Sequence, residues 1–359
     1  MTELDLRESL ELHLDRVDVP PPPLGPVVVA GRRRRRLRRG AAATTVTAAL
    51  AAVVLGGVHV MGSEQPGRGL DSAGSLSLGP LDFAHGARAY ADPGRELHLA
   101  GRMFPAGELG MLDTDAVATA YGVVYFDHGR PTLLGRDGRD HPLVAGDVDG
   151  GLRSTAKADS VHPWVAYATR RDGTTTLTVH DLQTGEDVAS TTIDGLGADG
   201  LVVDALDDGV VYVRTEQLTR AWDTADGGWR TVYDGGGRVV DVRGGVMLYD
   251  GAPPADLGLR RVEAPVDATL TFDGRHVLSW SSRLRATDGG PDLVLDQGPT
   301  GKGLGFWAID SDGSVLVARP DGGYPDFLVY DCDASSGACE LLGPLKAKGG
   351  DPEFLGADM

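Results

Sequence analysis

The sequence predicts an all-β fold, a β-propeller of six or seven blades, preceded by one transmembrane α-helix and a short cytoplasmic segment. Short runs of β-branched and aromatic residues return about every 40 residues through the C-terminal part of the chain. The dipeptide Asp-Gly, which tight β-hairpin turns favour, occurs 13 times between residues 137 and 322. Residues 40–62 contain no Asp, Glu, Lys or Arg and are long enough to cross a bilayer as a helix.

Residues 1–39 are predicted to form the cytoplasmic segment, which starts with a small amphipathic helix. The proline-rich stretch at residues 20–26 ends this helix, because proline removes a backbone donor. Four apolar side chains share one face and would dock on a cytoplasmic protein; the alternative is a weakly helical tail without a partner. The residues of this face are Leu6, Leu10, Leu14 and Val17.

Seven arginines stand directly before the apolar stretch 40–62. Positive residues stay on the cytoplasmic side, so we expect a single-pass protein of the cell membrane with a cytoplasmic N-terminus and an extracytoplasmic C-terminal domain. A cleaved secretory signal and a soluble core helix are the alternatives. The first lacks an A-x-A-like cleavage site after Gly62, and the second would be unusual beside so many charges. These arginines are Arg32, Arg33, Arg34, Arg35, Arg36, Arg38 and Arg39.

Charge divides the chain into two unequal parts. Residues 1–62 hold 9 Lys and Arg against 6 Asp and Glu, a net charge of +3 within a formal total of −18. The remainder therefore carries −21. Such an acidic domain repels nucleic acid and anionic headgroups, so the expected partners are the bilayer around the helix and an unknown extracytoplasmic protein or small ligand.

A Gly- and Ser-rich linker is predicted at residues 63–79, and the propeller at residues 80–359. In one repeat, residues 164–169 give an inner strand, Asp172-Gly173 a turn, and residues 174–182 a second strand. The phrase HDLQTGE (residues 180–186) then resembles the outer hairpin of WD40-like and TolB-like propeller blades, although no blade has the full Gly-His…Trp-Asp signature. The repeated runs are residues 122–126, 164–169, 209–214, 245–249, 276–280 and 314–319.

Closing such a ring requires its two ends to pair, because an open ring leaves strand edges exposed. Residues 87–104 and 351–359 both look like strands. We expect them to share one blade, which would make the count seven; without this composite blade the count is six.

The two cysteines of the chain, Cys332 and Cys339, bracket a Ser-Ser-Gly turn between strand-like runs. Outside the cytoplasm such a pair is normally oxidised, so a disulfide across a hairpin is expected. A zinc site is the alternative, but two cysteines without companion histidines form an incomplete ligand shell.

No motif identifies a catalytic residue, a cofactor or a metal. Gly195, Gly197 and Gly200 match G-x-G-x-x-G, but strand-like residues follow where a dinucleotide site needs a helix. Residues 147–150 and 310–313 resemble the start of calcium loops but lack the closing bidentate acid.

The sequence therefore favours a non-enzymatic binding or sensing module. Its overall layout resembles membrane-bound partners of extracytoplasmic-function sigma factors, which implies signalling to a cytoplasmic partner such as a sigma factor. The alternatives are a surface hydrolase of glycans or peptides, whose acids would come from separate blades, and a structural envelope component.

Overall fold

The computed structural model describes residues 86–91, 96–100, 102–105, 116–149, 155–193, 201–215, 218–279, 283–296, 306–323, 326–346 and 353–356. All of them belong to one compact unit, residues 69–359. The predictions for the cytoplasmic segment, its apolar face, the seven arginines, the membrane helix and the linker lie outside these ranges. Among the described residues, no helix has the length and apolar character needed to span a membrane.

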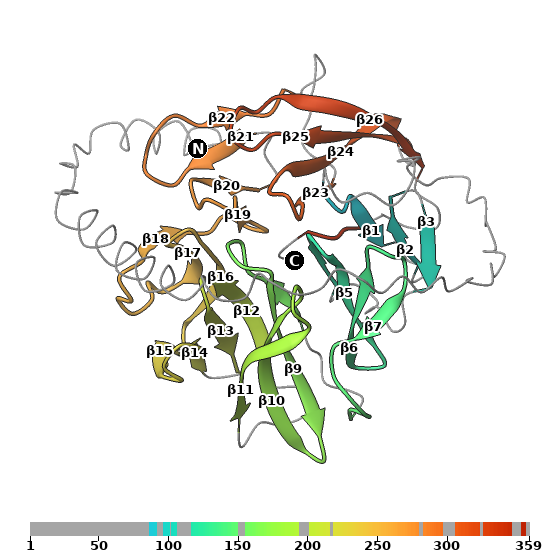
Figure 1. The fold of residues 1–359 in the computed structure, drawn as a ribbon. Helices are drawn as coiled ribbons and strands as arrows, with labels where there is room; N and C mark the ends of the chain where they lie inside the picture. Colours follow the sequence, from blue (N-terminus) through green and yellow to red (C-terminus); the bar gives the residue numbers. More distant parts are fainter. Residues whose placement is uncertain are drawn as a thin grey trace, which may run out of the picture. The chain divides into compact units, whose positions relative to one another are not determined.

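The described strands form seven sheets, and we call each sheet a blade (Figure 1). Blade 1 consists of β27 (Glu353–Phe354), β1 (Ala89–Ala91), β2 (Glu96–Leu99) and β3 (Arg102–Pro105). Blade 2 consists of β4 (Val117–Thr119), β5 (Gly122–Asp127), β6 (Arg130–Gly135) and β7 (Asp140–Pro142). Blade 3 consists of β8 (Lys157–Ala158), β9 (Trp164–Arg171), β10 (Thr174–Asp181) and β11 (Glu186–Ile193). Blade 4 consists of β12 (Val202–Asp207), β13 (Val210–Arg214), β14 (Leu218–Asp223) and β15 (Trp229–Asp234).

The remaining blades complete the ring. Blade 5 consists of β16 (Gly237–Arg243), β17 (Val246–Gly251) and β18 (Arg260–Glu263). Blade 6 consists of β19 (Thr269–Leu270), β20 (His276–Leu278), β21 (Arg283–Ala286) and β22 (Leu293–Val294). Blade 7 consists of β23 (Phe306–Ile309), β24 (Val315–Gly323), β25 (Asp326–Cys332) and β26 (Cys339–Lys346). The innermost strands of neighbouring blades, such as β8, β12 and β16, contact one another.

The predicted repeat is confirmed, with one correction. The six runs of the sequence form the second strand of blades 2 to 7, from β5 to β24. The prediction that residues 164–169 form an inner strand is wrong, because β8 lies inside β9. β8 has two residues. A strand this short shows no alternation of apolar and polar residues, so its sequence carries no strand pattern.

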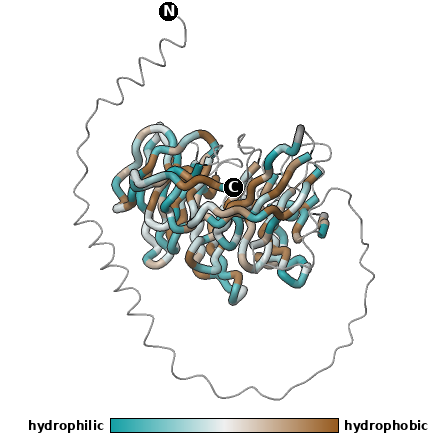
Figure 2. Tube along the Cα trace, turned by 90° about the horizontal axis from the view of Figure 1, so that it is seen from above, coloured by the Kyte–Doolittle hydropathy of each residue, from teal (hydrophilic) through white to brown (hydrophobic). Residues whose placement is uncertain are grey.

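The second strand of each blade gives a clear apolar pattern in the sequence because the neighbouring blades cover both of its faces. In β5, the first five residues are buried without interruption, which explains the continuous apolar run. The outer strand β11 is mostly exposed. Hydrophobic segments accordingly lie within the blades, and many of the turns are hydrophilic (Figure 2). At Asp172-Gly173 both φ angles are positive, +50° and +75°, as a type I′ turn requires.

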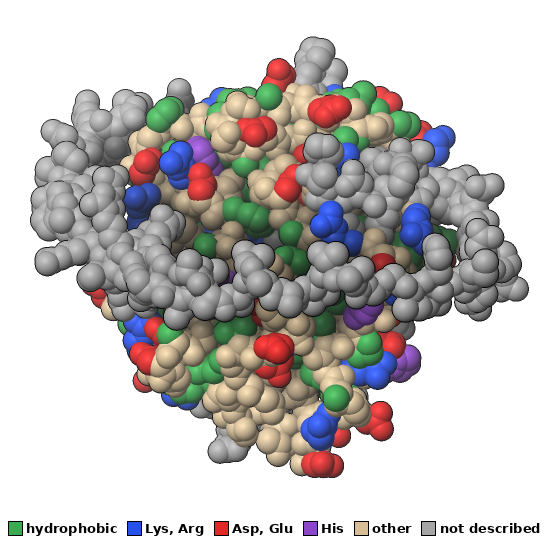
Figure 3. Space-filling view, viewed as in Figure 1, with side chains coloured by type: hydrophobic (Ala, Val, Ile, Leu, Met, Phe, Trp, Pro, Cys, Tyr) green, Lys and Arg blue, Asp and Glu red, His purple; other side chains and the backbone are tan. Residues whose placement is uncertain are grey.

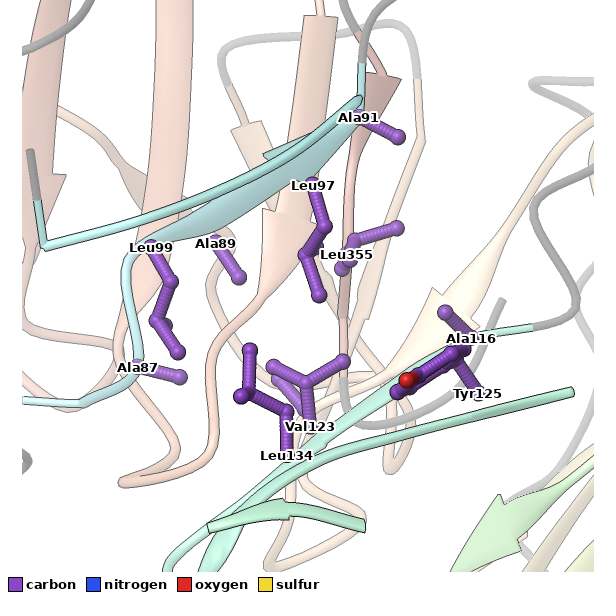
Figure 4. Close-up of a cluster of buried hydrophobic side chains, with 11 residues drawn as sticks. Ala87, Ala89, Ala91, Leu97, Leu99, Ala116, Val123, Tyr125, Leu134 and Leu355 are labelled. Atoms are coloured by element: carbon purple, nitrogen blue, oxygen red, sulfur yellow. The ribbon is translucent and has the colours of Figure 1, made fainter. Parts of the chain in front are cut away.

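The first and last described strands pair in blade 1, which confirms seven blades in the described structure. Tyr90 of β1 stands opposite Phe354 of β27, and the Leu355 N–H donates to the Ala89 carbonyl at 2.9 Å. Phe354 packs in a cluster with side chains of blade 7. Leu355 packs with Leu97 and with Val123 of blade 2 (Figure 4). The C-terminal strand therefore bridges both neighbouring blades.

Candidate functional site

One pocket opens where loops of several blades converge, and we call it the mouth pocket. Its volume is about 230 Å³. Blades 3 and 6 are not neighbours in the ring, so residues from both can line one pocket only near the ring axis. The described lining residues are Ala118, Thr119, Ala120, Tyr121, Ala158, Asp159, Ser160, Val161, His162, Pro163, Trp164, Leu182, Phe272 and Ser311.

The β8–β9 loop supplies five of the fourteen lining residues, and Asp159 shapes this loop. Its carboxylate accepts hydrogen bonds from the N–H groups of Val161 at 2.7 Å and His162 at 3.2 Å. It also accepts one from Gly209 of blade 4 at 3.2 Å. These bonds fold the loop back on itself and fix it to the next blade. Val161 is left with 56% of its surface exposed.

His162 is a titratable side chain of the mouth pocket, and 33% of its side chain is exposed. Its ring stacks on Trp164 with 4.1 Å between centroids and 14° between planes. The Trp164 indole N–H donates to Asp181 at 3.3 Å, which holds the stack in place. The hydrogen bond between His162 Nδ1 and Asp159, at 3.5 Å, raises the pKa of His162. The negative charges of Asp159, Asp208 and Asp181 act in the same direction.

The described lining of the mouth pocket lacks the paired carboxylates of a usual glycosidase. Asp159 is its single carboxylate among these residues, and that side chain has 0% exposure. A glycosidase of the usual kind needs two carboxyl groups that both reach the substrate. The Ser160 hydroxyl donates to Asp207 at 3.5 Å, so it is engaged away from His162. The accessible groups suit ligand binding: aromatic rings, an imidazole and hydroxyls.

Buried aspartates join successive blades near the ring axis. Asp207 accepts from the Gly244 N–H at 3.2 Å, and Asp241 accepts from the Leu270 N–H at 2.8 Å. Asp310 accepts from the N–H groups of Ala87 at 3.0 Å and Arg88 at 2.9 Å. Each bond runs from one blade to the next.

Sequence reasoning missed these aspartates, although a signal was present. Asp207 and Asp310 end or follow an inner strand directly before a turn, and Asp159, which bonds to Gly209 of the next blade, follows β8 directly before a bend. Asp241 lies within β16 and carries no such signal. The resemblance of residues 147–150 and 310–313 to calcium loops has another explanation. Asp149 accepts from the Gly173 N–H at 3.0 Å, and Asp310 is occupied as described above. The described residues contain no group of three acids, histidines or cysteines that could hold a metal.

Burial raises the pKa of three aspartates well above the ordinary value of 3.8. For Asp207 and Asp310 the pKa is about 6. For Asp204 it is also about 6, because burial outweighs the bidentate Arg214. On the surface, acidic and basic side chains are interspersed in the view of Figure 3.

In the exposed turn between β25 and β26, the hydroxyls of Ser335 and Ser336 lower the pKa of Asp333 to about 2.

These shifts predict that the unfolding free energy is greatest near pH 4 and decreases as pH rises from there. Above pH 4 the unfolded chain loses protons that the three buried aspartates keep until about pH 6, so stability falls as pH rises through this window. The raised pKa of His162 acts in the same direction, since its contribution is present below pH 6.5 and is lost as pH rises through the folded pKa. The contribution of Asp333 is present above pH 3.8 and is lost as pH falls through its folded pKa of about 2.

Urea unfolding at pH 4 to 8 checks this profile. The variant Asp207→Asn should have a smaller slope between pH 4 and 6 than the parent chain. A stability that increases steadily from pH 5 to 8 would show that burial does not control these groups.

The predicted disulfide is confirmed. Cys332 and Cys339 are bonded and stand directly opposite each other in β25 and β26. Both lie in a cluster with Leu293 and Leu295 of blade 6. The Asp296 N–H donates to the Gly337 carbonyl of the same hairpin at 2.8 Å. The disulfide therefore stiffens a hairpin turn of blade 7 that contacts blade 6. Gly195, Gly197 and Gly200 lie outside the described residues.

Fold and pocket together define a seven-bladed β-propeller with a loop-lined opening near its axis. No protein-family model and no curated protein matches this chain.

Among solved structures, TolB-like and WD40 propellers are its structural neighbours. TolB from Acinetobacter baumannii is 12% identical over 75% of this chain and 66% of that chain, with a TM-score of 0.33. A putative TolB from Agrobacterium tumefaciens is 12% identical over 72% of this chain and 88% of that chain, with a TM-score of 0.35. An oligogalacturonate lyase in complex with manganese is 15% identical over 61% of this chain and 60% of that chain, with a TM-score of 0.27.

Proposed function

We propose that this chain is a single-pass membrane protein whose propeller lies on the extracytoplasmic side and serves as a non-enzymatic binding or sensing module. The mouth pocket carries this proposal. Loops of four blades meet there and present apolar and aromatic surface with a few polar groups, a combination typical of ligand sites. The buried Asp159 carboxylate supports binding over hydrolysis.

Three features support the extracytoplasmic placement of the propeller. Residues 40–62 are uncharged, and seven arginines stand directly before them. Cys332 and Cys339 form a disulfide, a bond that persists in oxidising compartments. The apolar face of the N-terminal helix would then lie in the cytoplasm, where it would contact a protein such as a sigma factor. This face consists of Leu6, Leu10, Leu14 and Val17.

A pocket-filling variant tests the binding function. The full-length protein in detergent is screened by thermal unfolding against sugars, amino acids and short peptides, next to Ala120→Phe and Ala225→Phe. Ala120 lines the mouth pocket, whereas Ala225 is exposed in the β14–β15 turn. A ligand at 100 times its Kd adds about 2.7 kcal/mol, which raises Tm by roughly 5 °C or more.

We expect at least one compound to stabilise the parent chain and Ala225→Phe but not Ala120→Phe. Equal stabilisation of all three proteins would place binding elsewhere. Chemical conversion of a stabilising compound by the protein would favour the hydrolase instead.

A further inference from the structure

Blade 5 differs from the other blades in the described structure. It has three strands, and β18 runs parallel to β17, whereas every other pair within the described blades is antiparallel. The chain reaches β18 from β17 through residues 252–259. The side of β18 that faces away from β17 is therefore the edge of the sheet, at the position where the other blades carry a fourth strand.

The backbone of β18 leaves pairing groups on this edge. The Arg260 N–H donates to the Gly245 carbonyl at 3.0 Å, and the Ala264 N–H donates to the Tyr249 carbonyl at 2.7 Å. Peptide groups alternate in direction along a strand, so those of Arg261 and Glu263 point away from β17. The Glu263 carbonyl accepts from Arg285 of blade 6 at 2.8 Å. Among the described residues, no hydrogen-bond partner is found for the Arg261 N–H and carbonyl or for the Glu263 N–H, which leaves these groups for an added strand.

Three arginines, Arg260, Arg261 and Arg285, lie at this edge, together with the carboxylate of Glu263. Arg260 reaches Thr287 Oγ1 at 3.2 Å, and Arg261 reaches the Pro254 carbonyl at 2.9 Å, so the two guanidinium groups lie on opposite faces of the blade. These two arginines and Arg285 are exposed, and each donates to an uncharged oxygen. None forms an ion pair with a described carboxylate. Such a group of three guanidiniums is unexpected in a domain that carries −21.

An exposed apolar side chain follows β18 closely in the chain. Val266, three residues beyond β18, has 79% of its surface exposed, the largest value among the large hydrophobic residues that the structure describes.

We propose that an extended acidic segment of a partner protein adds to blade 5 as its outer strand, beside β18. Its backbone pairs with Arg261 and Glu263, its carboxylates meet Arg260, Arg261 and Arg285, and an apolar side chain covers Val266. Main-chain pairing of this kind supplies affinity, while the alternating side chains supply selectivity. The site is separate from the mouth pocket, which blade 5 does not line among the described residues.

The probe is a fluorescein-labelled octapeptide of alternating Glu and Val, compared with its Lys and Val counterpart by anisotropy with the full-length protein. We expect only the acidic peptide to bind. Arg261→Glu should weaken binding at least tenfold because it reverses one charge. Ala120→Phe should leave it unchanged.

Two variants of Glu263 separate the effect of backbone pairing from the effect of charge. Glu263→Ala and Glu263→Pro lose the same charge, but only proline removes the outward N–H, and an edge strand tolerates it there. We expect Glu263→Pro to bind the acidic peptide about five- to tenfold more weakly than Glu263→Ala, since one hydrogen bond is lost. If Glu263→Pro does not fold, slower amide exchange at Arg261 and Glu263 in the peptide complex gives the same evidence.

Three results would overturn the proposal. The first is equal binding of the Lys and Val peptide. The second is equal binding by Glu263→Pro and Glu263→Ala, or unchanged exchange where the proline variant does not fold. The third is self-association of the protein that Arg261→Glu abolishes, which would assign the edge to a second copy of this chain.

Discussion

Phe354→Ala is expected to lower the unfolding free energy by about 3–5 kcal/mol, the usual cost of truncating a fully buried phenylalanine. Phe354 is 2% exposed, and its ring meets Tyr90 edge-on with 6.4 Å between centroids. It belongs to the innermost strand of the blade that closes the ring. Its loss therefore weakens the junction of blades 1 and 7 as well as removing apolar contacts. Urea unfolding followed by circular dichroism measures the effect.

Glu353→Ala is the matched control, because Glu353 pairs with β1 through its backbone and its side chain is half-buried. We expect it to cost less than about 1 kcal/mol. Equal effects of the two variants, or a Phe354→Ala protein as stable as the parent, would show that the C-terminal strand does not close the ring.

Asp310→Ala is expected to cost about 3–4 kcal/mol, because it leaves backbone donors of two blades without an acceptor. The Asp310 side chain is buried and accepts from Ala87 and Arg88 of blade 1 and from Ser311 at 2.6 Å. Alanine cannot accept any of these bonds. The same unfolding measurement at pH 7 gives the loss.

Two variants show whether the hydrogen bonds cause this loss. Asp310→Asn keeps one acceptor oxygen and should lose about half as much stability. Asp312→Ala removes an exposed side chain whose hydrogen-bond donor among the described residues is the Ser314 N–H, and should cost below about 1 kcal/mol. A loss in Asp312→Ala as large as in Asp310→Ala would mean that turn geometry, and not the junction between blades, determines stability.

The blades could be predicted where burial shapes the sequence. Strands such as β5 and β9 lie between neighbouring blades, so burial selects continuous apolar runs. The Asp-Gly turns mark the hairpins between them. The innermost strands β8 and β19 have two residues each, too few for any pattern. The parallel pairing of β18 has no local signal, because it depends on how residues 252–259 fold back over the blade.

The candidate site could be predicted only where its residues are close in sequence. Cys332 and Cys339 flank one turn, so their pairing followed from the hairpin. The mouth pocket joins Tyr121, His162, Phe272 and Ser311 from four blades, and no spacing relates these residues. The buried aspartates bond to the next blade, a partner that becomes evident only once the ring is assembled.

The oxidation state of Cys332 and Cys339 in living cells tests the extracytoplasmic placement most directly. Cells producing the full chain are treated with a membrane-impermeant maleimide, before and after an impermeant phosphine reductant, with Cys332→Ser/Cys339→Ser as the blank. Cys339 is the more accessible cysteine. We expect no labelling before reduction and labelling of intact cells after it. Thiols that react without reductant, and only once the cells are lysed, would place the propeller in the cytoplasm and contradict the proposed function.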